Sequence, residues 1–600
     1  MSRPRSAQEL IHWLDAGEGA RWIRRAAFLA LVVVLSLRVG WTQFRGPQSE
    51  ATLMQAETGL RLATGAGFVT GVNFPQTASV LKARGVPFDP SKPYPELHHA
   101  PLYPLVVATV LTLVPSSTRE RWFATPPAIP DGFAPDYLLL ALNVALLWLV
   151  VWRAARLAEG LFGGRAALLT ALGLLFSFPV WQATAAVNGQ PLLMLLAVLF
   201  FEVWRWLIRQ SGTGAGGAAL LAPAGILGVI GGLLFLAEYP AGVLGVFAWV
   251  TAPLSFARSA RLRVFAAVGA GLLLTAGPWL VRNVNLTGHP LALARHDLAL
   301  KAGDPTAEPA TLRATLSAEA PRIDLRKLGN KLLGSVQESL RSRLWSGGAM
   351  WFTAFLVAGW LYAFRSAEAD RLRWLFTVAF GLALVVQAAC NSGELERPVA
   401  VWMAPLIVVF GAGFVGVLLA SSELVSNWPR LAITVLLGLQ GLPLVHSALE
   451  PRRLHFQYPP YFPALFQGMR QELEKRGALP AYGVMADVPA GVAWYGGVRA
   501  WSQPPRLKDF HAITLEQPIG ELLLSPRTLD RPFLSDLSAR PAAGPGLLGA
   551  GANRFGEWGE IYGGLLTGTL PRGFPLSSAQ KLADNLYVLL NPALPPAREK

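Results

Sequence analysis

The segment 95–104 carries residue types suited to chemistry on a polar substrate at a membrane surface. It reads PELHHAPLYP and places Glu96, His98, His99 and Tyr103 at the start of a long apolar run. Prolines restrict the backbone there, and a histidine can donate to a phosphate or relay a proton near neutral pH. Ionisable residues at the mouth of a membrane helix are costly unless they serve a site. We expect these side chains to line a substrate site.

Two carboxylates precede this segment in a pattern that predicts a helix. Glu50, Met54, Glu57 and Arg61 recur at helical spacing and share one face if residues 50–63 form a helix. Both carboxylates are therefore candidate catalytic residues. A structural alternative exists for each, because Glu57 can pair with Arg61 four residues on and Glu50 can cap or solvate the helix start. We favour pairing for Glu57 and a catalytic role for Glu50.

Basic residues at the ends of later apolar runs are candidates for binding a phosphate. Arg282 follows GPW at 277–279, and Arg397 precedes a proline and another apolar run. A guanidinium at that depth matches the charge of a departing phosphate, although an interfacial anchor next to Trp279 is the competing interpretation. Glu238 lies between two apolar runs, where a carboxylate needs a partner or water, so it is predicted to line the same cavity.

Metal and cysteine chemistry receive less support from the sequence. The HHAP stretch has no established metal-ligand spacing, and no acidic DxD motif accompanies it, so a divalent metal is a minor alternative and no ligand is assigned. The single cysteine, Cys390, lies in an apolar run and excludes both an intramolecular disulfide framework and a CxxC metal site.

Composition indicates a mostly α, polytopic transmembrane bundle. Of the 600 residues 52% are hydrophobic and 15% charged, and the apolar residues fall into runs that predict about 12 to 13 spans. The net charge of +15 comes from short arginine clusters between these runs rather than from one basic domain, which excludes a nucleic-acid partner. The runs are 26–39, 101–114, 137–152, 166–178, 191–208, 218–236, 241–254, 264–281, 350–364, 374–390, 399–420 and 431–445.

The arginine clusters also predict the topology. Clusters at 153–165, 205–209, 258–263 and 365–373 are expected in the cytoplasm, which places the opposite loops outside. We expect a transmembrane domain at 1–450 with outer loops at 41–100 and 282–348, and a small soluble α/β domain at 451–600 on the extracytoplasmic face of a bacterial inner membrane. One conflict remains, because two spans are counted between loop 41–100 and the first cluster where an odd number is required.

The second outer loop contains one further pattern. Leucines and a valine at helical spacing alternate with lysines and arginines between 325 and 343. Such a basic amphipathic helix suits a membrane surface, and a helix packed on the C-terminal domain is an equal alternative.

Taken in order, these residues resemble the GT-C class of membrane glycosyltransferases, in particular the branch with protein O-mannosyltransferases and the transferase that adds aminoarabinose to lipid A. The acidic first loop continues into LRLATGAGF at 60–68, and HAPLYP at 99–104 opens the next apolar run. GPWLVRN at 277–283 ends a later run, and ERP at 396–398 is a weaker match. The resemblance covers roughly the first 420 residues.

The resemblance implies transfer of a sugar from a polyprenyl-phosphate carrier to an acceptor on the outer face. It assigns the general base to Glu50, with serine in front of it where an aspartate is common, and carrier-phosphate binding to Arg282 and Arg397. His99 matches the residue before the family's Pro-Pro or Ala-Pro step. Glu96 matches a second acidic position of some members. A single base suffices for direct displacement with inversion. The implied partners are the lipid-linked sugar, membrane lipid, and a glycan, lipid or protein acceptor.

Two other functions fit the same composition. A flippase or transporter for a lipid-linked sugar would place charges near the bilayer midplane and show repeated halves, whereas these candidates cluster at one face. A non-catalytic relative that binds a partner through its outer domain would tolerate loss of both Glu50 and Glu57.

Overall fold

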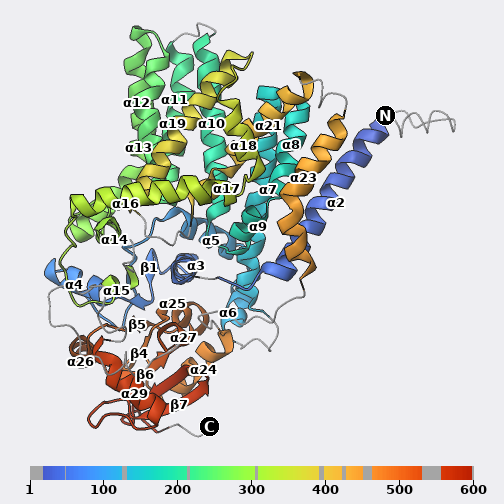
Figure 1. Ribbon diagram of the computed structural model, residues 1–600. Coiled ribbons are helices and arrows are strands. Elements are labelled where there is room, and N and C mark those ends of the chain that lie inside the picture. The colour runs from blue at the N-terminus through green and yellow to red at the C-terminus, as the bar shows by residue number, and fades with distance from the viewer. Residues whose placement is uncertain are drawn as a thin grey trace.

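Long apolar helices fill one half of the molecule and a small mixed sheet lies at the other end, as Figure 1 shows for the computed structural model. The structure describes residues 18–47, 49–124, 132–212, 217–303, 309–390, 397–421, 428–450, 462–529 and 556–596. Glu396 of the expected ERP motif and most of the connector at 211–217 lie outside these ranges.

The bundle is built from runs that the sequence marks as apolar. Within the described ranges, seven helices are long and apolar enough to cross a membrane, or eight if the bent pair α8 and α9 is one span, so the chain is an integral membrane protein. The bundle helices are α2 (Glu18–Gln43), α7 (Ala134–Phe162), α8 (Gly164–Leu175), α9 (Phe178–Ala185), α10 (Gln190–Gly212), α11 (Gly217–Ala237), α12 (Val243–Thr251), α13 (Arg258–Thr287), α18 (Trp351–Gly359), α19 (Ala367–Cys390), α20 (Val399–Trp402), α21 (Ala404–Ser421) and α23 (Pro429–Leu449).

This number is smaller than the 12 to 13 spans expected from the sequence. Several apolar runs form helices too short to cross: the run 101–114 becomes the 11-residue α5 (Leu102–Thr112), and the run 350–364 contains the 9-residue α18. Eleven residues rise only about 16 Å, whereas the hydrocarbon core is about 30 Å thick. Apolar length in sequence therefore overcounts spans when a run is broken by a turn.

The short α5 also removes the topology conflict. After α5 the chain enters α6 (Ser116–Ala124), whose Phe123 ring lies 5.2 Å from the ring of Trp494 in the C-terminal region. The segment from α5 to α6 therefore begins and ends on the side of the bundle that faces the sheet. Only α7 then crosses the bundle to the first arginine cluster.

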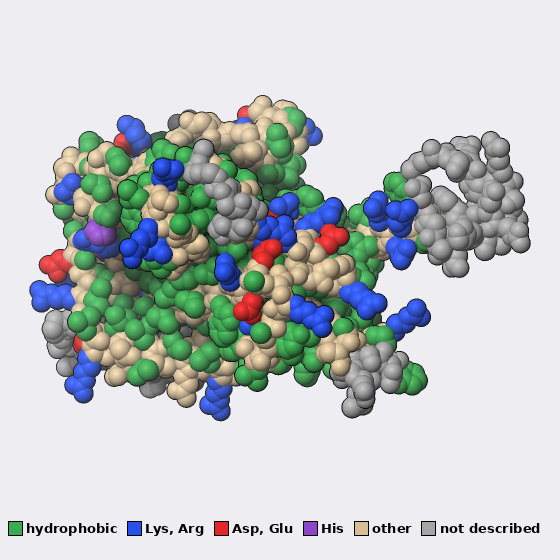
Figure 2. Space-filling model, turned by 90° about the horizontal axis from the view of Figure 1, so that it is seen from above, with side chains coloured by type: hydrophobic (Ala, Val, Ile, Leu, Met, Phe, Trp, Pro, Cys, Tyr) green, Lys and Arg blue, Asp and Glu red, His purple; other side chains and the backbone are tan. Residues whose placement is uncertain are grey.

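The basic clusters gather at the end of the bundle remote from the sheet. Arg205 on α10 donates to the carbonyl of Gly160 on α7 and pairs with Glu368 on α19, which brings three helix ends together. Figure 2, the view onto this end, shows Lys and Arg side chains around its rim. The expected arginine clusters thus lie together at one end of the bundle, and their placement in the cytoplasm remains a prediction.

A layer of short elements separates the bundle from the sheet (Figure 1). It comprises α3 (Glu50–Ala63), β1 (Val69–Thr70), β2 (Val72–Asn73), α4 (Pro75–Ala83), β3 (Tyr94–Pro95), α5, α6, the 3-10 turn η1 (Tyr239–Gly242), α14 (Ala294–Gly303), α15 (Pro309–Arg313), α16 (Leu325–Glu338), the π-helical turn η3 (Ser339–Arg343) and α17 (Leu344–Ser346). The layer holds most of the candidate site residues, and Arg282 reaches it from α13.

The amphipathic pattern of the second outer loop forms α16 as the sequence predicts. Asp324 caps its start by accepting from the backbone N–H groups of Arg326 and Lys327. Figure 1 shows α16 lying across the bundle rather than on the sheet, and the side chains of Leu325 and Leu333 are about three-quarters exposed. An exposed apolar edge with basic neighbours in this orientation suits the membrane interface.

The C-terminal region forms a six-stranded sheet with the order β2-β5-β4-β6-β8-β7. The strands around β4 are parallel, and β8 and β7 are antiparallel. Its elements are α24 (Pro463–Lys475), β4 (Gly483–Ala486), α25 (Pro489–Gly491), the π-helical turn η4 (Val492–Gly496), β5 (Ala500–Ser502), α26 (Leu507–Glu516), β6 (Ile519–Leu524), α27 (Pro526–Leu529), the 3-10 turn η5 (Gly556–Trp558), α29 (Gly559–Thr567), β7 (Ser578–Ala583) and β8 (Leu586–Leu590).

One edge of this sheet comes from the first outer loop. Val72 and Asn73 of β2 pair in parallel with Ala500 and Trp501 of β5. The backbone hydrogen bonds of an edge strand are thus satisfied by a segment more than 400 residues away in sequence, which joins the C-terminal region to the loop that carries the candidate site.

A buried carboxylate also attaches the sheet region to the bundle. Asp136, at the start of α7, accepts from the Trp494 indole N–H at 2.9 Å and from the Tyr495 hydroxyl at 2.8 Å. All three residues are at most 5% exposed. Both carboxylate oxygens are therefore occupied, and removal of either acceptor leaves a buried donor unsatisfied.

We expect Asp136→Asn to lower the free energy of unfolding by about 1–3 kcal/mol, because the amide presents one acceptor to two donors. Thermal unfolding of the purified protein in detergent measures the change. Asp584→Asn removes a carboxylate that is 98% exposed and serves as the matched control. Equal stability of Asp136→Asn and the native chain would contradict this role for Asp136.

Candidate functional site

Helix α3 begins the site and directs its polar residues to different faces. The Ser49 hydroxyl caps it by accepting from the N–H of Thr52 at 3.2 Å. At about 100° per residue, Glu50 and Glu57 lie within about 20° of each other and Gln55 lies about 140° from Glu50. The two expected catalytic carboxylates therefore share a face that does not include Gln55.

Glu57 is bound on both of its carboxylate oxygens. Oε1 accepts from Arg61 Nε at 2.6 Å, and the N–H of Gly71 lies 3.1 Å from each oxygen. The side chain is 1% exposed. A Cβ at Gly71 would lie 2.9 Å from Oε1, so only glycine allows this approach. The pairing with Arg61 that the sequence favours is present, and Glu57 holds the turn between β1 and β2.

Glu50 faces the C-terminal region. Its Oε2 accepts from the backbone N–H of Ala490, in α25, at 2.9 Å. The side chain is half-buried, unlike those of Glu57 and Glu96. Glu50 is thus the one expected carboxylate of the three that retains access to solvent.

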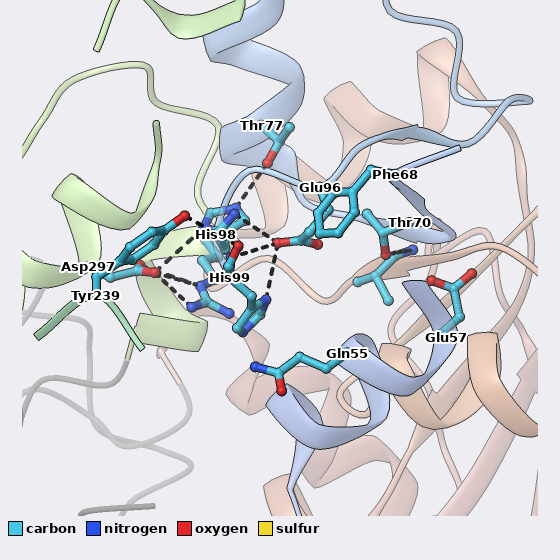
Figure 3. Close-up of polar contacts among 12 residues, drawn as sticks. Gln55, Glu57, Phe68, Thr70, Thr77, Glu96, His98, His99, Tyr239 and Asp297 are labelled. Atoms are coloured by element: carbon cyan, nitrogen blue, oxygen red, sulfur yellow. Dashed lines mark hydrogen bonds and ion pairs between the residues drawn. The ribbon is translucent and has the colours of Figure 1, made fainter. Parts of the chain in front are cut away.

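Glu96 organises the PELHHAP segment into a tight turn. Its Oε1 accepts from the backbone N–H of His98 at 2.8 Å and of His99 at 3.0 Å, and from His99 Nδ1 at 3.1 Å. Figure 3 shows the three side chains gathered at one point, with Glu57 apart from them beyond Thr70. One carboxylate oxygen therefore positions both histidines.

The charge state of Glu96 follows from this environment. Burial alone would raise the pKa of the Glu96 carboxyl, but the His99 imidazole, followed by His98, outweighs burial and lowers that pKa to about 2. The carboxylate stays ionised at every physiological pH, so Glu96 is better suited to orienting groups than to accepting a proton.

His98 is held on the other side of the turn. Its Nε2 lies 3.1 Å from the Thr77 hydroxyl, and its Nδ1 lies 3.5 Å from Asp297, which in turn pairs with Arg313 at 2.7 Å. Burial, and then the charge of Arg313, lower the pKa of His98. Burial would raise the pKa of Asp297, but Arg313 and His98 together outweigh burial and keep that pKa far below the usual range. Arg313 thus acts on both groups.

Arg282 connects the end of α13 to this turn. Its Nη2 donates to the carbonyls of Glu96 at 3.2 Å and Phe68 at 3.3 Å. The guanidinium lies 4.4 Å from the ring centroid of Trp279 and 5.3 Å from that of Phe68, so two aromatic rings fix its orientation. The contact with Trp279 expected of an interfacial anchor is present together with contact to the site.

Arg397 lies two residues before the start of α20, and its side chain reaches α3. Its Nη1 pairs with Glu238 at 2.5 Å and its Nη2 donates to Gln55 Oε1 at 2.8 Å. Next to Glu238, the Tyr239 hydroxyl lies 3.4 Å from the His99 carbonyl and accepts from the Trp279 indole at 2.9 Å. Adjacent residues of one chain segment therefore link Arg397 to the His99 turn.

Besides His98 Nδ1, which lies 3.5 Å from Asp297, three buried polar atoms of this cluster have no hydrogen-bond partner among the described residues: Glu96 Oε2, His99 Nε2 and Arg397 Nε. Figure 3 shows Gln55 extending from α3 toward the His99 ring. Unpaired buried polar atoms are rare in folded proteins and each calls for a cause, such as an absent ligand. An anion and a hydroxyl would satisfy this set.

Tyr103 occupies a structural position. Its hydroxyl donates to the Val187 carbonyl at 2.7 Å and accepts from Asn143 at 2.8 Å. The ring packs on Gly189, whose φ of 75° and lack of a Cβ allow the contact. Tyr103 ties α5 to the turn before α10, and its expected role in substrate binding remains a prediction.

The structure brings six of the expected residues together in one connected cluster: Glu96, His98, His99, Arg282, Glu238 and Arg397. Glu50 and Glu57 lie outside this cluster, on the face of α3 opposite to Gln55. Sequence reasoning missed Gln55 and Asp297. Gln55 has a weak signal, a polar side chain on the face of α3 that is otherwise buried, whereas nothing in the pattern around Asp297 indicates a partner for His98.

Metal binding has no support from clustering. Within the ranges that the structure describes, no three His, Cys, Asp or Glu side chains are grouped so as to hold an ion. No metal-dependent step is therefore assigned to this site.

Comparison with known proteins supports the fold. No family model matches the sequence, and no curated protein matches it. The oligosaccharyltransferase of Archaeoglobus fulgidus, in its complex with Zn and sulfate, is similar in structure with a TM-score of 0.51 at 12% identity over 82% of this chain and 67% of that one. The chain has a GT-C membrane glycosyltransferase fold.

A second solved structure with this fold matches over more of its length. ArnT from Cupriavidus metallidurans bound to undecaprenyl phosphate matches at 15% identity over 95% of this chain and 98% of that chain, with a TM-score of 0.43. The oligosaccharyltransferase match, with its TM-score of 0.51, confirms the GT-C resemblance seen in the sequence as a statement about fold.

The low pKa of Glu96 predicts a defined pH dependence of stability. The folded-state pKa of about 2 lies below the usual 4.5, so the contribution of Glu96 is complete above about pH 4.5 and is lost as the pH falls toward 2. We expect Glu96→Gln to lower the unfolding temperature at pH 6 and to approach the native value near pH 3.

Thermal unfolding of both proteins between pH 6 and pH 3 measures this convergence. Glu159→Gln, which changes an exposed carboxylate at the opposite end of the bundle, controls for surface charge. A difference that is the same at every pH would show that shape rather than charge is lost in the Glu96 variant.

Proposed function

We propose that this protein transfers a sugar from a polyprenyl-phosphate carrier to an acceptor on the outer face of a bacterial inner membrane. The observation that carries the proposal is the set of three unpaired buried polar atoms on Glu96, His99 and Arg397, where the bundle meets the layer of short elements. A lipid-linked donor enters from the bilayer and places its phosphate at this level. The GT-C fold agrees with such a donor.

Arg282 and Arg397 are the proposed carrier-phosphate ligands. Each guanidinium is already oriented, Arg282 by two aromatic rings and Arg397 by Glu238 and Gln55. Preorganised cations stabilise the charge that develops on the departing phosphate and cost little reorganisation. His99 Nε2 adds a third group that can donate to the same phosphate when it carries a proton.

Glu50 remains the proposed base. It is half-buried and accepts from the backbone N–H of Ala490, whereas Glu57 is 1% exposed with both oxygens bound and the pKa of Glu96 is about 2. In the proposed step the acceptor oxygen attacks the anomeric carbon as its proton passes to Glu50. The bond between that carbon and the carrier phosphate oxygen breaks, and inversion follows from one displacement.

We expect Glu50→Gln to reduce transfer by about 100- to 10,000-fold while carrier binding is retained, because the amide keeps the shape and removes the base. Lipid and glycan profiling of a deletion strain identifies the donor, and single turnovers in proteoliposomes with that donor measure the rate. Glu57→Gln is the paired variant on the same face of α3, and it should lose stability rather than the chemical step.

Three outcomes would change the assignment. Full activity of Glu50→Gln with an inactive, folded Glu57→Gln would move the base to Glu57. Normal activity of both variants would favour a non-catalytic binding protein. Movement of labelled carrier across liposomes without release of its sugar would favour a flippase.

We expect Arg282→Gln and Arg397→Gln each to weaken binding of undecaprenyl phosphate by about tenfold or more, the size of one lost charge-assisted contact. Binding to nanodisc-embedded protein at fixed ionic strength measures the effect. Arg371→Gln, at the arginine-rich end of the bundle, is the control. Unchanged affinity in both variants would remove the carrier-phosphate role.

A further inference from the structure

A polar cavity lies beside the Glu96 cluster, in the layer of short elements between the bundle and the sheet. It has a volume of about 140 Å³ and is formed by the end of α4, the turn that follows α13 and the start of α14. Its polar lining consists of Arg84, Thr287, His289, Arg295 and His296. Among the described residues that line it, none is acidic.

Both arginines of the cavity are available to a ligand. Arg84 and Arg295 are exposed, and neither makes a side-chain hydrogen bond or ion pair within the described parts of the chain. Gly288, with a φ of 77°, brings its Cα beneath Arg84, since a Cβ there would lie 3.1 Å from Arg84 Nη1. Two unpaired like charges at one cavity repel each other unless an anion lies between them.

Both histidines present a donor rather than an acceptor. His289 Nδ1 accepts from the backbone N–H of Leu291 at 3.2 Å, and His296 Nδ1 accepts from the Gln76 amide at 3.0 Å. With Nδ1 acting as acceptor, the proton of a neutral imidazole resides on Nε2. His296 is 3% exposed, lines the cavity, and has no partner for Nε2 within the described residues. Its Nε2–H is therefore available to a ligand in the cavity.

We propose that this cavity binds a phosphate group through Arg84, Arg295 and the Nε2–H donors of His289 and His296. The lining supplies cations and donors without a carboxylate, which is the chemistry that recognises an oxyanion. A single water needs roughly 10–15 Å³ on this measure, so 140 Å³ has room for one phosphate-sized group and not for a whole lipid or polymer.

The position of the cavity indicates where such a phosphate comes from. Thr287, in its lining, is the last residue of the membrane-length helix α13. The cavity therefore lies at the depth of lipid headgroups, where the phosphate of a membrane lipid and free phosphate in solution are both within reach. Either source has the same chemistry at the site.

The phosphate site is distinct from the Glu96 cluster but adjoins it. Gln76 binds His296 of the cavity, and the next residue along α4, Thr77, binds His98. On α14, Asp297 follows His296 and faces His98 from the other side. The same two helices thus support both sites with neighbouring residues, and the binding proposal does not depend on sugar transfer.

The test uses the full chain in phosphatidylcholine nanodiscs at constant ionic strength. Isothermal titration calorimetry measures binding of inorganic phosphate and, separately, of dihexanoyl phosphatidic acid. We expect the double variant Arg84→Gln/Arg295→Gln to weaken binding by about tenfold for each lost contact. Arg322→Gln/Arg572→Gln removes the same charge from exposed positions elsewhere and should bind as the native chain does.

A second variant adds a charge without removing a native contact. Ala83 is exposed and lines the cavity, so Ala83→Glu should fold and weaken binding through repulsion. Tighter binding of phosphatidic acid than of phosphate would identify a lipid headgroup as the ligand, and equal binding would identify the free anion. Absence of binding to the native chain, or native affinity in both cavity variants, would overturn the proposal.

Discussion

One carboxylate oxygen determines the geometry of the candidate site. Glu96 Oε1 accepts hydrogen bonds from two backbone N–H groups and from the His99 imidazole. In the turn that results, the backbone carbonyl of Glu96 accepts from Arg282. A buried carboxylate is costly unless donors surround it, so the turn closes only where these donors converge. The bundle, through α13, and the first outer loop are thereby held at a fixed separation, as a site for a donor that enters from the bilayer requires.

The C-terminal region is attached to the elements that carry the site. β2 of the first outer loop forms an edge of the sheet, Asp136 of α7 binds Trp494 and Tyr495, and Glu50 binds the backbone of Ala490. Contacts from three segments place the sheet against the face of α3 that carries Glu50.

Much of the site could be predicted because local spacing determines it. The pairing of Glu57 with Arg61 follows from a separation of four residues on one helix, and the helix α16 follows from leucine spacing. Gln55 as a partner of Arg397 could not be predicted, because the two residues are 342 positions apart and no local pattern relates them. The same holds for His98 with Asp297.

The sequence by itself determined the class of protein, the helical bundle, the basic end of that bundle and the residues from which a site could form. These follow from the length of apolar runs, the positions of charged residues and the helical period, which are all local properties of the chain. Tertiary structure alone decided which apolar runs cross, since a run such as α5 must also be long enough once it folds. It also decided that Glu50 and Gln55 face opposite partners and that β2 completes a distant sheet, because these contacts arise from packing between segments far apart in the chain.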